Sequence, residues 1–172
     1  VRLDEFNNRT HAVGPDGRPD FESERFVYLG DQANMPYGDY PAAGKEQFLR
    51  ELALQDAVFL LGARYWPSAD ASSPKNDKPP VKAVVIACNT ATAYGLEYIR
   101  SAFREWDIPV YLVGVVEAGA KGALESEQSA AAAAVDKYAS GRKSAIAVMA
   151  TVGTCRSEGY VRAAEKVFRE AG

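Results

Sequence analysis

The stretch KAVVIACNTATAY, residues 82–94, contains the change of pattern that decides the fold. It begins within an apolar run rich in β-branched residues, 81–87, which is typical of a buried strand. The run stops at the polar triplet 88–90, after which small and apolar residues follow with helical spacing. The sequence therefore predicts a strand over residues 81–87 and a helix over residues 91–106, joined without a long loop.

The same alternation of strand and helix recurs on both sides of this stretch. Further apolar runs predict three more strands: residues 26–29, 108–113 and 145–150. Amphipathic spacing predicts three more helices: residues 45–66, 117–138 and 156–171. Strands with few polar interruptions, separated by helices, favour a parallel sheet that helices cover on both faces. We therefore predict an α/β fold with a parallel sheet flanked by helices.

Length and composition favour a single domain. The chain has 172 residues, 47% of them hydrophobic, which is enough for one core of ordinary domain size. Residues 67–80 contain four prolines and three serines and predict a flexible surface insertion. Since neither an internal repeat nor a second domain is evident, we treat residues 1–172 as one α/β lobe.

Several function classes are disfavoured by composition. The net charge of −3 and the absence of a dense Lys/Arg cluster disfavour a nucleic-acid partner. The apolar runs are far too short to span a membrane, and the polar start shows no signal peptide, so a cytoplasmic location is expected. A disulfide scaffold is disfavoured because the chain has two cysteines, and a metal site because His11 is its one histidine. Neither a GxGxxG nor a P-loop motif is present.

Short polar side chains and glycines follow the predicted strands, where ligands of parallel sheets bind. Such groups, with the helix N-termini behind them, are suited to a small carboxylate. Cys88 lies at a strand-to-helix junction, where the positive end of the helix dipole favours a thiolate; a small buried structural cysteine is the alternative. Cys155, at the predicted start of the last helix, could face the same cleft or the core. Tyr37, before a glycine in a polar loop, is the tyrosine best placed to face a ligand.

Four segments together carry a resemblance to a known family: YLGDQANMPYG (28–38), VVIACNTATA (84–93), VGVVEAGAKGA (113–123) and MATVGTCRSEGY (149–160). They resemble, in order, a strand-Gly-Asp with a Pro-Tyr-Gly substrate loop, a first catalytic-cysteine motif, a Gly-Val-Val-x-x-Gly-Ala segment, and a Thr-x-Gly-Thr segment with Ser and Tyr. These are motifs of the aspartate/glutamate racemases, and the chain looks closest to glutamate racemase.

The resemblance implies a flavodoxin-like racemase lobe and an isomerase that needs no cofactor and no metal. In that family two cysteines face opposite sides of the substrate α-carbon; one thiolate removes the α-proton and the other thiol returns one. The substrate would be glutamate or aspartate, and the complete protein would supply D-glutamate for cell-wall peptidoglycan. Cys88 would be the first acid/base thiol. The implied substrate-binding residues are Tyr37, Gly38, Asn89, Thr90, Thr151 and Thr154.

Two motifs of the family are absent from this chain: an opening Asp-Ser-Gly-x-Gly-Gly and a later Gly-Cys-Thr-His that carries the second cysteine. Cys155 occupies a position where the family usually has an apolar residue, so it is not expected to be the second base. We expect the chain to be most of the N-terminal lobe of a two-lobe racemase, and to be inactive by itself. A homodimer is compatible with the sequence.

Two other interpretations stay open from the sequence. One is another member of the superfamily, such as an aspartate racemase, a hydantoin racemase or a maleate-isomerase-like enzyme. The other is a non-catalytic α/β module that binds a small carboxylate, with Cys88 as a buried structural residue.

Overall fold

A computed structural model describes residues 25–133 and 145–171 of the chain. The strands are β1 (Ala83–Ile86) and β2 (Tyr111–Gly114). The helices are α2 (Asp39–Ala42), α3 (Glu46–Leu61), α4 (Asn89–Glu105), α5 (Val115–Ala133), α6 (Val152–Arg156) and α7 (Gly159–Ala171). His11 and the last residues of the helix predicted over 117–138 lie outside the described residues. None of the described helices is both long and apolar enough to cross a membrane.

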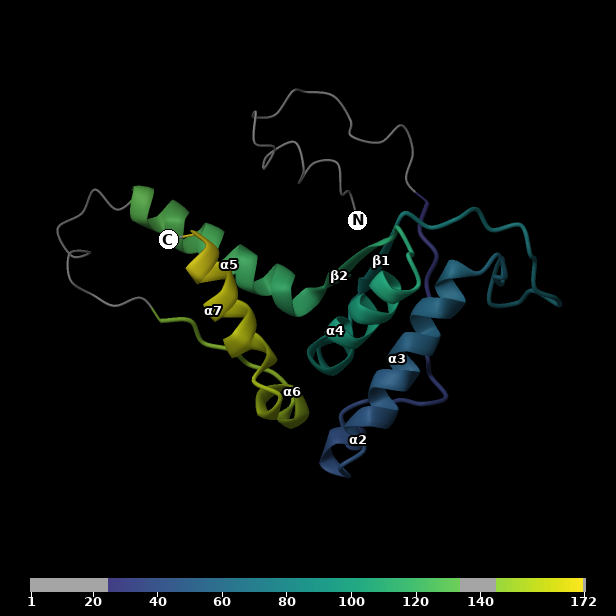
Figure 1. Cartoon of the computed structure of the whole chain (residues 1–172), viewed down its shortest axis with the longest axis horizontal. Helices are drawn as coiled ribbons and strands as arrows, with labels where there is room; N and C mark the ends of the chain where they lie inside the picture. The colour runs from purple at the N-terminus through teal and green to yellow at the C-terminus, as the bar shows by residue number, and fades with distance from the viewer. Residues whose placement is uncertain (1–24, 134–144, 172) are drawn as a thin grey trace, which may run out of the picture.

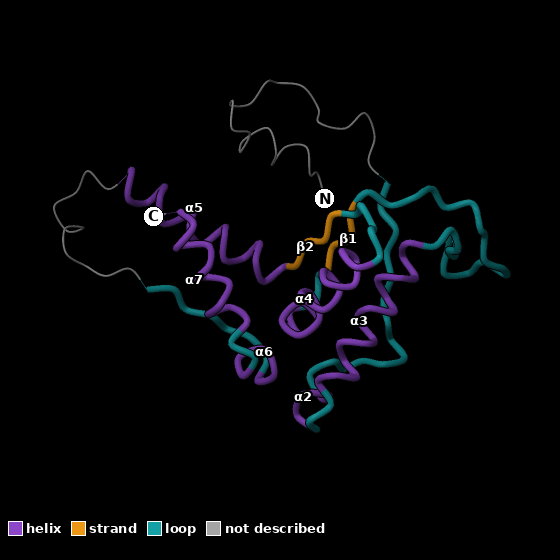
Figure 2. The backbone as a smooth tube through the Cα atoms, in the orientation of Figure 1, coloured by secondary structure: helices purple, strands orange, loops and turns teal. Residues whose placement is uncertain are grey.

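The two strands form a parallel sheet, and helix α4 connects them. Ala83 is paired with Tyr111 and Ile86 with Gly114. Figure 2 shows the strands between α3, on the right, and α5 and α7, on the left, with α4 below the strands. The predicted α/β fold, a parallel sheet flanked by helices, is confirmed for this part of the chain.

One face of the sheet is covered and the other is open. Val84 is buried, and Gly114 approaches α4 so closely that an added Cβ would lie 2.4 Å from Cγ2 of Thr92. On the opposite face Val85 is 58% exposed and Tyr111 is 79% exposed. The prediction that helices cover both faces therefore holds for one face among the described residues.

Two of the four predicted strands do not form in the described structure. Residues 26–29 and 145–150 have no strand assignment, and they pair with neither β1 nor β2. Their apolar side chains are largely exposed: Tyr28 is 91% and Met149 is 99% exposed. The predictions were wrong here because an apolar run supplies strand propensity, whereas a strand also needs a partner with which to exchange backbone hydrogen bonds.

Helix α3 ends earlier than predicted because Gly62 follows Leu61 in an extended conformation. The proline-rich segment after it returns to this helix end, where the buried Lys78 donates a hydrogen bond from Nζ to the Leu60 carbonyl at 2.8 Å. That bond satisfies one of the carbonyls left free in the last helical turn. The flexibility predicted for residues 67–80 stays a prediction.

The apolar core has two separate parts. The first lies where α3 packs on α4, and its buried members are Tyr37, Leu49, Ala53, Ala57, Ala91, Ile99 and Phe103. The second lies between α5 and α7, and its buried members are Val116, Ala120, Ala163 and Val167. Figure 1 shows these two helix pairs diverging from the sheet. Gly95 permits the contact of α3 with α4, since an added Cβ would lie 2.9 Å from that of Ala53.

The helix predicted over 156–171 corresponds to α7, which begins three residues later, and a separate short helix, α6, precedes it. Glu158 separates them with a positive φ of 53°, a conformation that ends a helix. Ser157 fixes the turn, because its hydroxyl donates to the Thr154 carbonyl at 2.6 Å and accepts from the backbone N–H of Gly159 at 3.1 Å. Cys155 consequently lies within α6 and not at the start of a long helix, which corrects the sequence prediction.

Candidate functional site

Cys88 is the N-cap residue of α4. Its backbone is extended, and its Sγ accepts a hydrogen bond from the backbone N–H of Ala91 at 3.5 Å. The residue is exposed and its thiol is free. The sequence prediction of a thiol at a strand-to-helix junction is thus met in the structure, and the alternative of a buried structural cysteine is not. A thiol in this position faces the unpaired N–H groups of a 17-residue helix, which stabilise a nearby anion.

Three threonines from two helix starts form a continuous set of hydroxyls. Thr151 donates from its hydroxyl to Oγ1 of Thr154 at 3.1 Å, and Oγ1 of Thr154 lies 3.2 Å from Oγ1 of Thr90. Thr151 also caps α6 by accepting from the backbone N–H of Thr154. Thr154 is 1% exposed, whereas Thr151 is exposed. The structure therefore brings together all three threonines that the sequence singled out, with Thr154 as the buried link.

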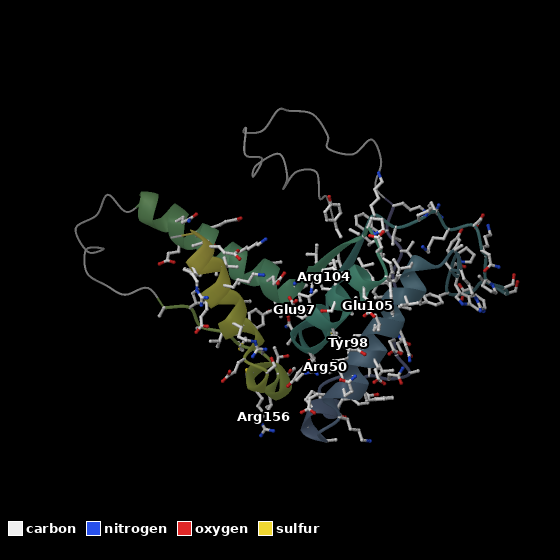
Figure 3. All side chains as sticks on the ribbon, in the orientation of Figure 1. Arg50, Glu97, Tyr98, Arg104, Glu105 and Arg156 are labelled. Atoms are coloured by element: carbon white, nitrogen blue, oxygen red, sulfur yellow. The ribbon has the colours of Figure 1, made fainter. Side chains whose placement is uncertain are left out.

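The loop before α2 lies against the start of α6. An added Cβ on Gly153 would be 3.5 Å from the carbonyl oxygen of Gly38, so the two backbones are close neighbours. Tyr94 of α4 donates from its hydroxyl to the Gly153 carbonyl at 3.2 Å and holds α6 against α4. Helix α6 therefore lies against both α4 and the loop before α2. Figure 3 shows Arg156 at the far side of α6, pointing away from α4.

Tyr37 is placed differently from the other predicted residues. Its ring is buried in the first core, and its hydroxyl lies 2.7 Å from Oδ2 of Asp31 and 2.8 Å from Oδ2 of Asp56. Burial raises the pKa of Tyr37 well above its usual range, and the two carboxylates raise that pKa further. The hydroxyl is thus occupied within the protein, and the substrate contact predicted for this residue stays a prediction.

Comparison with known proteins gives one consistent set of relatives. The chain is 35% identical over 138 residues to a glutamate racemase of Enterococcus faecalis, which covers 80% of this chain and 36% of the relative. It is 31% identical over 145 residues to a glutamate racemase of Limosilactobacillus fermentum, an alignment that covers 84% of this chain and 40% of the relative. It is 30% identical over 138 residues to a glutamate racemase of Staphylococcus epidermidis, with 80% of this chain and 37% of the relative covered. The resemblance to glutamate racemase is confirmed. No protein-family model matches the chain, and no solved structure gives a significant match.

The chain spans between 36% and 40% of the length of these three relatives. The glutamate racemase resemblance implies a second thiol, and Cys155 does not supply it in the described structure. The Cys155 thiol donates a hydrogen bond to the carbonyl oxygen of Ala150, with 3.6 Å between Sγ and that oxygen. Among the described residues, no group of three or more His, Cys, Asp or Glu side chains is placed to hold a metal ion.

Three residues that contact the predicted site residues were not predicted from the sequence. Asp31 and Asp56 hold Tyr37, and Tyr160 of α7 donates from its hydroxyl to Oδ1 of Asn89 at 3.0 Å. Asp31 and Tyr160 both lie within segments that carry the family resemblance. Their place in those segments was the one feature of the sequence that could have pointed to them. Asp56 gave none, because its role depends on where α3 meets the loop before α2.

The contact between Tyr37 and two carboxylates predicts a pH-dependent stability. One hydroxyl proton cannot satisfy both carboxylates. Burial and the charge of Asp31 raise the pKa of Asp56 above its ordinary value of 3.8, although the Tyr37 hydrogen bond lowers it. Because the raised pKa favours the acid form in the folded state, this contribution to stability is fully present below about pH 4 and is lost as the pH rises through the folded-state pKa.

Asp56→Asn should remove this loss, because the amide can donate to the Tyr37 oxygen while Tyr37 donates to Asp31. We expect the variant to match the wild type near pH 4 and to exceed its free energy of unfolding by about 0.5–1.5 kcal/mol near pH 7. Urea titrations across this pH range measure the difference. Asp70→Asn, at an exposed aspartate, serves as the control. A variant that is less stable than the wild type at every pH would contradict the interpretation.

Proposed function

We propose that the chain forms one half of a glutamate racemase site, in which Cys88 exchanges the α-proton on one face of the substrate. The observation that carries the proposal is an exposed thiol at the start of α4, adjacent to the Thr90–Thr154 pair of hydroxyls. The relatives named glutamate racemase support glutamate as the substrate.

The arrangement suits binding of an amino acid by its carboxylate. The free backbone N–H groups in the first turn of α4 are donors from which a carboxylate can accept hydrogen bonds. The Thr151 hydroxyl is not counted among them, because its proton is donated to Thr154. The amide nitrogen of Asn89 adds a second kind of donor beside the thiol. A substrate held by these groups would present one face of its α-carbon to Sγ of Cys88.

The proton transfer follows from this position. The Cys88 thiolate takes the α-proton, so the C–H bond breaks, an S–H bond forms, and the electron pair stays on the α-carbon next to the carboxylate. Inversion requires a proton from the opposite face, which a second thiol would supply in the complete protein. The product from L-glutamate would be D-glutamate, the form used for peptidoglycan.

The 172-residue chain alone should therefore not racemise glutamate. One thiol can act on one face of the α-carbon only, and Cys155 is turned to the Ala150 carbonyl. Incubation of the purified chain with L- or D-glutamate, followed by chiral chromatography, measures this. Interconversion above the buffer rate, retained in Cys155→Ser and lost in Cys88→Ser, would overturn the two-thiol proposal for this protein.

Alkylation of Cys88 tests the binding half of the proposal. We expect iodoacetamide to modify Cys88 faster than free cysteine at neutral pH, by about two- to fivefold, because the helix N-terminus stabilises an adjacent anion. Glutamate should slow the reaction, and aspartate should slow it less. Peptide mass spectrometry separates Cys88 from Cys155, which acts as an internal reference that glutamate leaves unchanged.

The same experiment distinguishes the alternatives. Stronger protection by aspartate than by glutamate would favour another member of the superfamily. A Cys88 that reacts no faster than free cysteine and gains no protection from either amino acid would contradict both racemase interpretations.

A further inference from the structure

We propose that Tyr160 is a positioning residue that orients the Asn89 amide toward the substrate, an inference that rests on the proposed function. Its hydroxyl donates to Oδ1 of Asn89 at 3.0 Å, across 71 positions of sequence. Asn89 is the first residue of α4 and follows Cys88 directly. The contact therefore reaches the site from α7, a helix that contributes none of the residues discussed above as substrate ligands.

The Tyr160 ring is in contact with the second core. It packs against the buried cluster formed by α5 and α7. Gly119 of α5 makes room for it, since an added Cβ there would lie 3.3 Å from Cε1 of the ring. This packing limits the positions of the ring, and the hydroxyl lies at its exposed end, where it reaches Asn89.

The chemical consequence concerns which end of the amide faces the site. An asparagine side chain has an acceptor oxygen at one end and a donor nitrogen at the other. Because a tyrosine hydroxyl donates to Oδ1, the Nδ2 hydrogens are left to point elsewhere, and among the described residues they donate to no partner. A donor amide beside Cys88 attracts a carboxylate, whereas the reversed amide would oppose it with an oxygen.

Tyr160→Phe keeps the ring and removes the hydroxyl. We expect the concentration of glutamate that half-protects Cys88 from iodoacetamide to rise roughly three- to tenfold, since one orienting hydrogen bond is lost. The alkylation rate without glutamate and the thermal midpoint should stay at the wild-type values. Tyr98→Phe, which removes a hydroxyl from the exposed side of α4, is the matched control and should leave half-protection unchanged.

A double-mutant cycle with Asn89→Ala tests whether Tyr160 acts through the amide. If it does act through the amide, Tyr160→Phe should not change the half-protecting concentration of glutamate in the Asn89→Ala background. An equal effect in both backgrounds overturns the positioning role, as does unchanged half-protection in Tyr160→Phe alone. If glutamate protects Cys88 in no variant, wild type included, the proposed function itself fails and the role of Tyr160 fails with it.

Discussion

Replacing Ile99 by alanine is expected to lower the free energy of unfolding by about 2–5 kcal/mol. Ile99 lies in the middle of α4, is fully buried, and belongs to the core between α3 and α4. Its removal leaves a cavity in the core cluster between α3 and α4. The two helices cannot close around that cavity, because their approach at Gly95 is already tight. Urea denaturation followed by circular dichroism measures the loss.

Ile146→Ala provides the matched control, because the same atoms are removed from a side chain that is 48% exposed. The expected change there is within about 0.5 kcal/mol. Equal losses at the two positions would contradict the packing described for α3 and α4, whereas a loss confined to Ile99 would support it. The comparison needs no assumption about substrate or activity.

A second large effect is expected at Gly114, the last residue of β2. Alanine there would place a Cβ 2.4 Å from Cγ2 of Thr92 and 3.0 Å from Cδ2 of Leu96, so β2 or α4 must shift. Thr92 donates from its hydroxyl to the Ile86 carbonyl, so the shift would disturb both strands of the sheet. We expect a loss of about 1–3 kcal/mol in the free energy of unfolding.

Gly122→Ala in α5 is the control for Gly114→Ala. Nothing lies within 4 Å of an added Cβ at Gly122, and alanine is the better helix former. The same substitution should therefore stabilise the protein by up to about 1 kcal/mol at this position. Opposite signs at the two glycines would confirm that contact, and not glycine replacement as such, determines the result. A neutral Gly114→Ala would contradict the close approach of β2 to α4.

The sequence predicted the central strand–helix–strand unit well, because its signals are local. The β-branched run before Cys88 and the helical spacing after it correspond to β1 and α4, and the next apolar run corresponds to β2 with a start three residues later. Two helices differ for equally local reasons. Gly62 ends α3 earlier than predicted. A positive φ at Glu158 makes α7 begin later than predicted, and nothing about a glutamate in the sequence signals that conformation.

What the sequence could not predict depends on contacts between distant segments. Residues 26–29 and 145–150 have strand-like composition, but pairing is a property of two segments and not of one. In the site, the grouping of Thr90 with Thr154 followed from strand ends and from the family resemblance. The partners of Tyr37 and Asn89 did not, because Asp56 and Tyr160 reach them from helices whose packing no short pattern encodes.

The two ends of helix α4 have different roles. Its start carries Cys88, Asn89 and Thr90 at the candidate site, while Ile99 and Phe103, further along, lie in the core. Random mutagenesis of this one helix should therefore give a gradient of phenotypes. Substitutions of the exposed residues at its start would yield folded protein with altered ligand recognition, and those of the buried Ile99 and Phe103 would lower the yield of folded protein. A screen that sorts variants by expression level alone would miss the first group entirely.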